Sequence, residues 1–189
     1  MEIVEKGHNK NSEYTVVDKR TGKTVNVDSL EEVEMYEWFD YALEKGVIED
    51  FTYQPKTFEL SQPVSYTNSK GKTRSRFREH VYSPDFRFTV SKGNDWLLDE
   101  LKYDFGTNVN REVWIDVKGT FNRNARSFSI DQKWVLWKYG IYIHKLIPKI
   151  FFKKCGIIDS FKTTRKTNKP SKKYEGYPDF DDVFSTKYS

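Results

Sequence analysis

Two short apolar runs each carry an acidic residue, and their spacing indicates a shared site. Asp85 lies in the run YSPDF (82–86), and Asp116 lies in the run WIDVKG (114–119). Because successive side chains of a strand point to opposite faces, Asp116 and Lys118 would share one face, about 6.6 Å apart along the strand. Pro84 lacks a backbone donor, which is typical of the start of a strand or of an edge strand. The sequence therefore predicts two carboxylates and one ammonium group at neighbouring strand ends.

Such a group of side chains suits metal-dependent chemistry on phosphate. Two converging carboxylates provide the oxygen ligands that Mg²⁺ prefers, and leave its other positions to water and to phosphate oxygens. A bound divalent ion lowers the pKa of its water toward about 7. Lys118 would orient that water or neutralise charge that develops on phosphorus. The alternative interpretation is structural, since an Asp-x-Lys pair on a strand is commonly a solvated face or a surface ion pair.

A third carboxylate would come from the clearest helix of the chain. This helix is expected to begin after Asp28 or Ser29 as N-cap and to end at Gly46. The candidates on it are Glu32, Glu34 and Glu37. The alternative is that glutamates near the start of a helix only complement the helix dipole, at about 0.3 to 1 kcal/mol each. The residues alone do not select one of the three.

Together these elements form an ordered pattern over residues 27–146: a Ser-x-x-Glu helix, an apolar-Pro-Asp-Phe run, an Asp-Val-Lys-Gly strand and a second helix. The pattern resembles the PD-(D/E)XK nuclease superfamily, and within it the phage endonuclease I type, the RecU-like proteins and the amino-terminal nuclease subunit of Tn7-type transposases. The resemblance selects Glu32, because the motif there is followed four residues later by an aromatic residue, here Tyr36. Gln54-Pro55 is similar to a step in RecU-like sequences. The chain departs from the commonest form of the family in having Asp116 where many members have glutamate.

The resemblance implies a metal-dependent DNA endonuclease that hydrolyses phosphodiester bonds. It implies that Mg²⁺, with Mn²⁺ as a substitute, is held by Glu32, Asp85, Asp116 and the carbonyl of Val117, and that Lys118 assists. In similar nucleases a residue on the second helix, here Gln132 or Lys133, holds the phosphate or the attacking water. The implied substrate is branched DNA such as a four-way junction, and the implied origin is a phage. A homodimer is expected, because nicks in two opposed strands need two centres related by a two-fold axis.

Two alternatives stay open beside the junction-selective enzyme. One is a sequence-specific or host-DNA-degrading nuclease. The other is a non-catalytic nucleic-acid-binding or virion-assembly protein that uses the same fold.

A basic segment between the two acidic runs is the candidate DNA contact. It spans residues 69–78 and is expected to be a loop that interrupts the sheet. Its alternating cations are Lys70, Lys72, Arg74, Arg76 and Arg78. Such side chains would bind the phosphate backbone without reading sequence, with a strong dependence on salt. The alternative is a solvated hairpin with no partner.

Length and composition limit the remaining choices. A chain of 189 residues with 14 Phe, 12 Tyr and 5 Trp can form one domain with a substantial core. The net charge is only +4, but acids concentrate in residues 28–50 and bases in 70–78 and 145–173, which suits a polyanionic partner. The single cysteine, Cys155, excludes an internal disulfide and a cysteine zinc site. No signal peptide or membrane span is expected, so we expect the cytoplasm, that of a bacterial host if the chain is phage-encoded.

The expected fold is α/β, a restriction-endonuclease-like core with a mixed central sheet between the Glu32 helix and a helix over 127–139. Strands are expected at 47–55, 57–60, 85–90, 114–119 and 141–147. Residues 1–27 would form an N-terminal extension with a hairpin, 28–160 the nuclease domain, and 161–189 a basic tail that packs on the domain or on a partner. We also expect Arg87 to be an ion-pair partner of Asp85, and Trp134, Leu136 and Trp137 to lie in the core.

Overall fold

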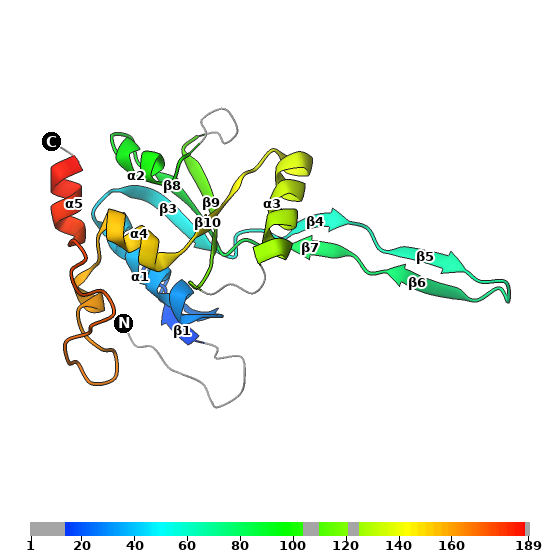
Figure 1. Ribbon diagram of the computed structural model, residues 1–189, viewed down its shortest axis with the longest axis horizontal. Coiled ribbons are helices and arrows are strands. Elements are labelled where there is room, and N and C mark those ends of the chain that lie inside the picture. Colours follow the sequence, from blue (N-terminus) through cyan, green and yellow to red (C-terminus); the bar gives the residue numbers. More distant parts are fainter. Residues whose placement is uncertain (1–13, 104–109, 121–124, 188–189) are drawn as a thin grey trace.

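The computed structural model describes residues 14–103, 110–120 and 125–187, so the first 13 residues of the expected N-terminal extension lie outside the described residues. Its elements follow one another from a short hairpin to a C-terminal helix (Figure 1). They are β1 (Tyr14–Val17), β2 (Thr24–Val27), α1 (Leu30–Glu44), β3 (Ile48–Tyr53), β4 (Phe58–Ser61), β5 (Val64–Thr67), β6 (Thr73–Phe77), β7 (His80–Tyr82), β8 (Phe86–Val90), α2 (Asp95–Glu100), β9 (Glu112–Val117), α3 (Ala125–Tyr139), β10 (Ile143–Leu146), α4 (Pro148–Cys155), the 3₁₀ helix η1 (Asp159–Phe161) and α5 (Phe180–Lys187).

A four-stranded mixed sheet in the order β10-β9-β8-β3 forms the centre of the domain. Strand β9 pairs antiparallel with β8 and parallel with β10, and β8 pairs antiparallel with β3. A parallel pair needs a crossover connection, which α3 provides between β9 and β10. The prediction of an α/β fold with a mixed sheet flanked by helices is confirmed, and the expected strands are present with ends that differ by a few residues.

The two long helices cover opposite faces of this sheet (Figure 1). Along β9, Val113, Ile115 and Val117 pack in the larger core cluster, which includes the buried apolar residues of α1. Trp114, which points the other way, packs with Phe58, Ile143 and two residues of α3, Phe128 and Val135. This alternation is the period-two pattern of a strand that is buried on both faces.

Helix α1 begins and ends where its capping residues predict. Ser29 is the N-cap, and its side chain accepts a hydrogen bond from the backbone N–H of Glu32. Gly46 follows the C-cap with φ of 72°, a left-handed conformation that glycine adopts without strain. The helix is buried around much of its circumference.

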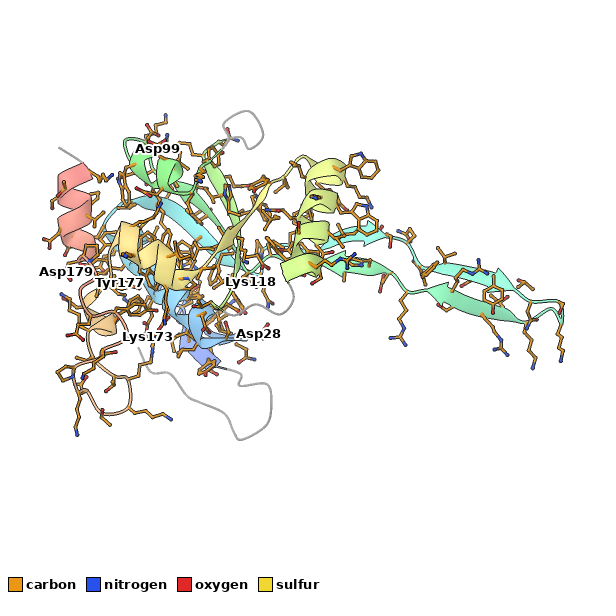
Figure 2. All side chains as sticks on the ribbon, viewed as in Figure 1. Asp28, Asp99, Lys118, Lys173, Tyr177 and Asp179 are labelled. Atoms are coloured by element: carbon orange, nitrogen blue, oxygen red, sulfur yellow. The ribbon has the colours of Figure 1, made fainter. Side chains whose placement is uncertain are left out.

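The C-terminal segment, residues 156–187, accounts for this burial, because it packs on the side of α1 away from the sheet. Phe161, Tyr174 and Phe180 join the larger core cluster, and the indole N–H of Trp38 donates to the carbonyl of Gly156 at 3.1 Å. Of the two alternatives for the basic tail, packing on the domain is therefore the one found. Figure 2 labels Lys173, Tyr177 and Asp179 on this segment, on the side of the domain opposite to the projecting ribbon.

That projecting ribbon, which we call the arm, consists of β4 to β7, residues 58–82 (Figure 1). Strand β4 pairs with β7 at its root and β5 pairs with β6 toward its tip, both antiparallel. The prediction of a loop over 69–78 is wrong for residues 73–77, which form β6; the alternative of a solvated hairpin is the one found. The ribbon is also longer than expected, because β5 and β7 were not predicted.

Two other differences have clear physical causes. Arg87 binds Asp50 at 2.7 Å and Glu112 at 2.9 Å, so its expected pairing with Asp85 is wrong. Each of these acids lies two residues from the cross-strand neighbour of Arg87 on β3 or β9, and so shares its face of the sheet. Trp137 is 80% exposed and therefore outside the core, because α3 buries the face that carries Phe128 and Val135 instead. Helix α4 was not predicted.

The expected N-terminal hairpin is confirmed for β1 and β2, which join through a turn at Gly22 with φ of 68°. The hairpin contributes to the core, because Val16 and Val27 are fully buried in the larger core cluster. None of the helices in the described part of the chain is long and apolar enough to cross a membrane.

Candidate active site

Asp85 and Asp116 lie at the same end of the sheet, where β8 begins and β9 ends. The backbone N–H of Asp85 donates to the carbonyl of Ile115 at 3.1 Å, and the backbone N–H of Val117 donates to Oδ2 of Asp85 at 2.6 Å. On the other side, the N–H of Gln54 donates to the carbonyl of Asp85 at 2.7 Å. Both neighbouring strands thus hold Asp85, and its side chain is fixed against the backbone of β9.

Asp116 is the most deeply buried of the acids, with 2% of its surface exposed. The hydroxyl of Tyr82 donates to its Oδ1 at 2.9 Å, and Nζ of Lys118 pairs with its Oδ2. The backbone N–H of Lys118 donates to the carbonyl of Leu146 at 2.8 Å, which continues the pairing with β10. Asp116 and Lys118 therefore share one face, as the strand pattern predicts. Figure 2 labels Lys118 near the place where the arm leaves the domain.

Glu32 approaches this end of the sheet from the first turn of α1. Its Oε1 accepts from the hydroxyl of Ser29 and its Oε2 from the hydroxyl of Tyr53, both at 2.7 Å. The start of α1 is close to the end of β9, since a Cβ placed on Gly119 would lie 3.6 Å from Oε1 of Glu31. The hydroxyl of Ser29 accepts from the backbone N–H of Glu32 and donates to its carboxylate, so the residue that caps the helix also orients this carboxylate.

Negative charge is crowded among these three carboxylates, of which Glu32 and Asp116 are buried and Asp85 is half-buried. Burial, followed by the charges of Glu32 and Asp116, raises the pKa of Asp85 to about 8, against the opposing effect of Lys118. Burial also raises the pKa of Glu32 and of Asp116, although Lys118 opposes the shift at Asp116. Buried carboxylates that perturb one another in this way are characteristic of functional sites and of buried ion-pair networks.

The three carboxylates are chemically suited to bind a divalent cation. Their contacts within the protein, however, keep them from converging on one cation. Within residues 14–103, 110–120 and 125–187, no three His, Cys, Asp or Glu side chains are grouped so that they could hold a metal ion. Glu32 is turned to Ser29 and Tyr53, and Asp116 to Tyr82 and Lys118. Carboxylate and carbonyl oxygens are nevertheless the ligands that Mg²⁺ prefers, and a cation would stabilise the charged form of Asp85, which burial and then the charges of Glu32 and Asp116 disfavour.

The other candidate glutamates of α1 lie away from this site. Glu34 accepts from Lys173 and from the hydroxyl of Tyr174, both at 2.6 Å. Glu37 forms a two-pronged ion pair with Arg165, at 2.7 and 2.8 Å. All three partners belong to the C-terminal segment, so these two glutamates fasten that segment to α1.

The two residues predicted to act from the second helix have different surroundings. Nε2 of Gln132 donates to the carbonyl of Ile143 at 2.6 Å and so ties α3 to β10. Lys133 is exposed on α3. Neither has a contact with the three acids among those that the structure gives, and their proposed roles toward phosphate stay predictions. Lys70, Lys72, Arg74, Arg76 and Arg78 all lie exposed on the arm.

Two tyrosines complete the site and were not predicted from the sequence. Burial and the neighbouring carboxylates raise the pKa of Tyr82, beside Asp116, and of Tyr53, beside Glu32. Both hydroxyls therefore keep their protons and donate to the acids. Tyr82 lies only three residues before Asp85, but its partner Asp116 is 34 residues further along the chain, so local sequence gives no signal of the contact.

Comparisons of the chain with protein-family models, with curated proteins and with solved structures found no match. Function is therefore inferred from the residues and geometry of the site.

Proposed function

We propose that this chain is a metal-dependent DNA endonuclease with a centre formed by Glu32, Asp85, Asp116 and Lys118. The observation that supports it most is the crowding of buried carboxylates at one end of the sheet, with an ammonium group on the same face. Burying several carboxylates together destabilises a fold unless a cation or protons neutralise them. Such an arrangement is best explained by a ligand that the acids exist to bind.

The chemistry follows from the side chains that surround this centre. Mg²⁺, or Mn²⁺ as a substitute, held by Asp85, Asp116, Glu32 and the carbonyl of Val117, would supply a Lewis acid and an activated water. Lys118 neutralises charge that develops on the phosphate oxygens, at the cost of its contact with Asp116. Tyr82 keeps Asp116 oriented when that contact opens. Gln132 and Lys133 remain the proposed second-helix contacts to phosphate or water.

The proposed substrate is DNA, preferentially branched, as in a four-way junction, cut by a homodimer of phage origin in the cytoplasm of the bacterial host. The exposed cations of the arm support a polyanionic substrate. A sequence-specific or host-DNA-degrading nuclease is the second candidate, because the same centre would cut duplex DNA. A non-catalytic binding or virion-assembly protein is less well supported, because it gains nothing from carboxylates directed at phosphate without a metal between them.

The test is cleavage of a labelled four-way junction, a linear duplex and a single strand, each with Mg²⁺ or with EDTA. We expect Mg²⁺-dependent cutting of the junction, and a loss of at least about 10²-fold in rate for Asp116→Ala and for Lys118→Ala. Asp99→Ala, on α2 and distant from Lys118 in Figure 2, and Lys92→Ala are matched controls that should cut normally. Thermal unfolding checks that each variant is folded.

Other outcomes discriminate between the alternatives. Cutting of every DNA with the same dependence on Asp116 and Lys118 would support the centre and reject the junction preference. Cuts at fixed positions of the linear duplex would support the sequence-specific enzyme. No cutting of any substrate by a folded protein would reject the nuclease and leave the binding protein.

A further inference from the structure

The two faces of the arm's outer half carry different kinds of side chain. In the register of β5 with β6, Ser65 lies opposite Ser75 and Thr67 opposite Thr73, while Tyr66 lies opposite Arg74. Residues directly opposite each other in an antiparallel pair point to the same face. One face is therefore lined by four small hydroxyl residues, and we call it the hydroxyl face. The other carries Tyr66 and Arg74.

An irregularity in the pairing extends this second face. Beyond Ser65 and Ser75 the register shifts, so that Val64 lies opposite Phe77 and Arg76 is the extra residue. With regular pairing, alternation along β6 would place Phe77 on the hydroxyl face. A bulge changes that alternation and moves Phe77 to the face of Val64 and Tyr66. The guanidinium of Arg76 lies 4.9 Å from the centre of the Tyr66 ring, which places it on this face as well.

The resulting surface, the aromatic face of the arm, combines rings with cations. Its members are Val64, Tyr66, Arg74, Arg76 and Phe77. Every residue of β5 and β6 is exposed, and Phe77 has 64% of its surface exposed. Lys70 and Lys72 add charge at the tip, and residues 62–78 contain no Asp or Glu. Figure 1 shows this half of the arm projecting away from the domain.

We propose that the aromatic face binds single-stranded DNA, with Tyr66 and Phe77 stacked on unpaired bases and Arg74 and Arg76 on phosphates. Arginine contacts with phosphate alone would suit any DNA. The exposed rings favour unpaired bases, because bases within a duplex already stack on one another, and rings beside cations are the usual platform for a single strand. A second copy of the chain is a poorer partner, since two such arms would bring identical cations together.

This inference deepens the proposed function and rests on it only in taking DNA as the polyanion. It places unpaired nucleotides of the substrate along the arm, while the acids at the sheet end act on a phosphodiester near the root of the arm. Unpaired nucleotides beside duplex arms are a feature of branched and partly open DNA. The arm would then contribute to the choice of substrate by a means separate from the centre.

The experiment measures binding of the full chain to a labelled single-stranded thymidine oligonucleotide and to a duplex, by fluorescence anisotropy in EDTA. We expect the double variant Tyr66→Ala, Phe77→Ala to bind the single strand at least roughly tenfold more weakly. The matched control Thr67→Ala, Ser75→Ala changes the hydroxyl face and should bind as the wild type does. Arg74→Gln with Arg76→Gln should reduce the slope of log affinity against log salt by about 1.4, from about 0.7 for each phosphate contact on a single strand.

A control variant distinguishes the loss of the rings from misfolding of the arm. Tyr66→Phe with Phe77→Tyr retains both rings and should retain binding. The proposal is overturned if the two faces give equal effects, if duplex binding falls as much as single-strand binding, or if RNA of matching sequence binds far more tightly. It is also overturned if the alanine variants change the oligomeric state seen by light scattering and leave DNA affinity intact. Binding is measured without metal and cleavage with Mg²⁺, so failure of the arm changes the first measurement and failure of the nuclease changes only the second.

Discussion

At the scale of single residues, Asp85 lies in surroundings that disfavour its charged form. Asp85 accepts a hydrogen bond from the backbone N–H of Val117. The ammonium group of Lys118 forms its ion pair with Asp116 and not with Asp85. Burial and two neighbouring carboxylates then raise its pKa to about 8. A carboxylate whose charged form is less favourable in the folded protein than in the unfolded chain lowers the free energy of unfolding. Its presence is therefore better explained by function than by folding.

The substitution Asp85→Asn should therefore stabilise the protein while it abolishes cleavage. In the unfolded chain Asp85 loses its proton near its ordinary pKa of 3.8, whereas in the fold it keeps the proton to about pH 8. Stability of the wild type is thus lost as pH rises through this window, and asparagine removes that loss while it still accepts from Val117. We expect the difference in free energy of unfolding to grow steadily with pH in EDTA, to several kcal/mol at pH 8, since each unit of pKa corresponds to about 1.4 kcal/mol; urea unfolding between pH 4 and pH 8 measures it.

Mg²⁺ supplies the control for this prediction. A ligand of the folded state raises stability by mass action, so Mg²⁺ should stabilise the wild type at pH 8 and leave Asp85→Asn unchanged. If the free energies of unfolding of the two proteins changed in parallel with pH, the surroundings of Asp85 would not disfavour its charged form. That outcome would remove the main support for the site.

At the scale of elements, the position of α1 depends on layers on both sides. The sheet covers one side, and the C-terminal segment covers the other through ion pairs with Glu34 and Glu37 and through Phe180. The segment is itself fixed where Gly156 meets Phe180, since the N–H of Phe180 donates to the carbonyl of Ile157 at 2.8 Å. The start of α1 carries Glu32, so this packing helps to hold a site residue in place.

Gly156→Ala should disrupt this packing more than a comparable glycine substitution. A Cβ on Gly156 would lie 2.6 Å from backbone atoms of Phe180, and the φ of 82° is unfavourable for alanine. We expect a loss of about 3 kcal/mol or more, from the strained backbone and the overpacking together, in urea unfolding.

Gly176→Ala is the matched control, because its φ of 76° is similar but a Cβ there would meet nothing within 4 Å. It should lose only the backbone contribution of about 1 to 2 kcal/mol. Equal losses in the two variants would show that the contact between Gly156 and Phe180 is not tight in solution.

At the scale of the whole molecule, the arm has an anchored root and a free outer half. The ring of Phe58 packs 5.0 Å from that of Tyr139 and 5.5 Å from that of Trp114. The hydroxyl of Tyr139 donates to the carbonyl of Glu59 at 2.6 Å, and His80 contacts Asp131 at 2.7 Å. Beyond this root, β5 and β6 are exposed along their whole length.

Excision of the outer half should therefore separate stability from DNA affinity. Ser61 and His80 are register partners, so residues 62–79 can be replaced by an Asn-Gly turn that closes the shortened hairpin. Removing exposed residues should change the free energy of unfolding by less than about 0.5 kcal/mol, measured by urea unfolding. Affinity for DNA and its salt dependence should both fall, because all five cations of residues 70–78 are removed. A large loss of stability would instead show that the arm is part of the folding unit.

The sequence by itself determined the local features that place the acids. Alternation of apolar and polar residues predicted β8 and β9, and with them the shared face of Asp116 and Lys118. Ser29 and Gly46 predicted the limits of α1, and the resemblance selected Glu32 from the three candidate glutamates of that helix. These features could be predicted because capping and strand alternation depend on residues only a few positions apart.

Only the tertiary structure decided which elements meet. The donors Tyr82 and Tyr53, the acids that bind Arg87, and the packing of the C-terminal segment on α1 all join residues that are distant in the chain. The aromatic face of the arm depends on a register shift that no local pattern revealed. These contacts follow from the order of strands and the packing of layers, which local propensity does not encode, and they determine how far the acids at the sheet end are buried and charged.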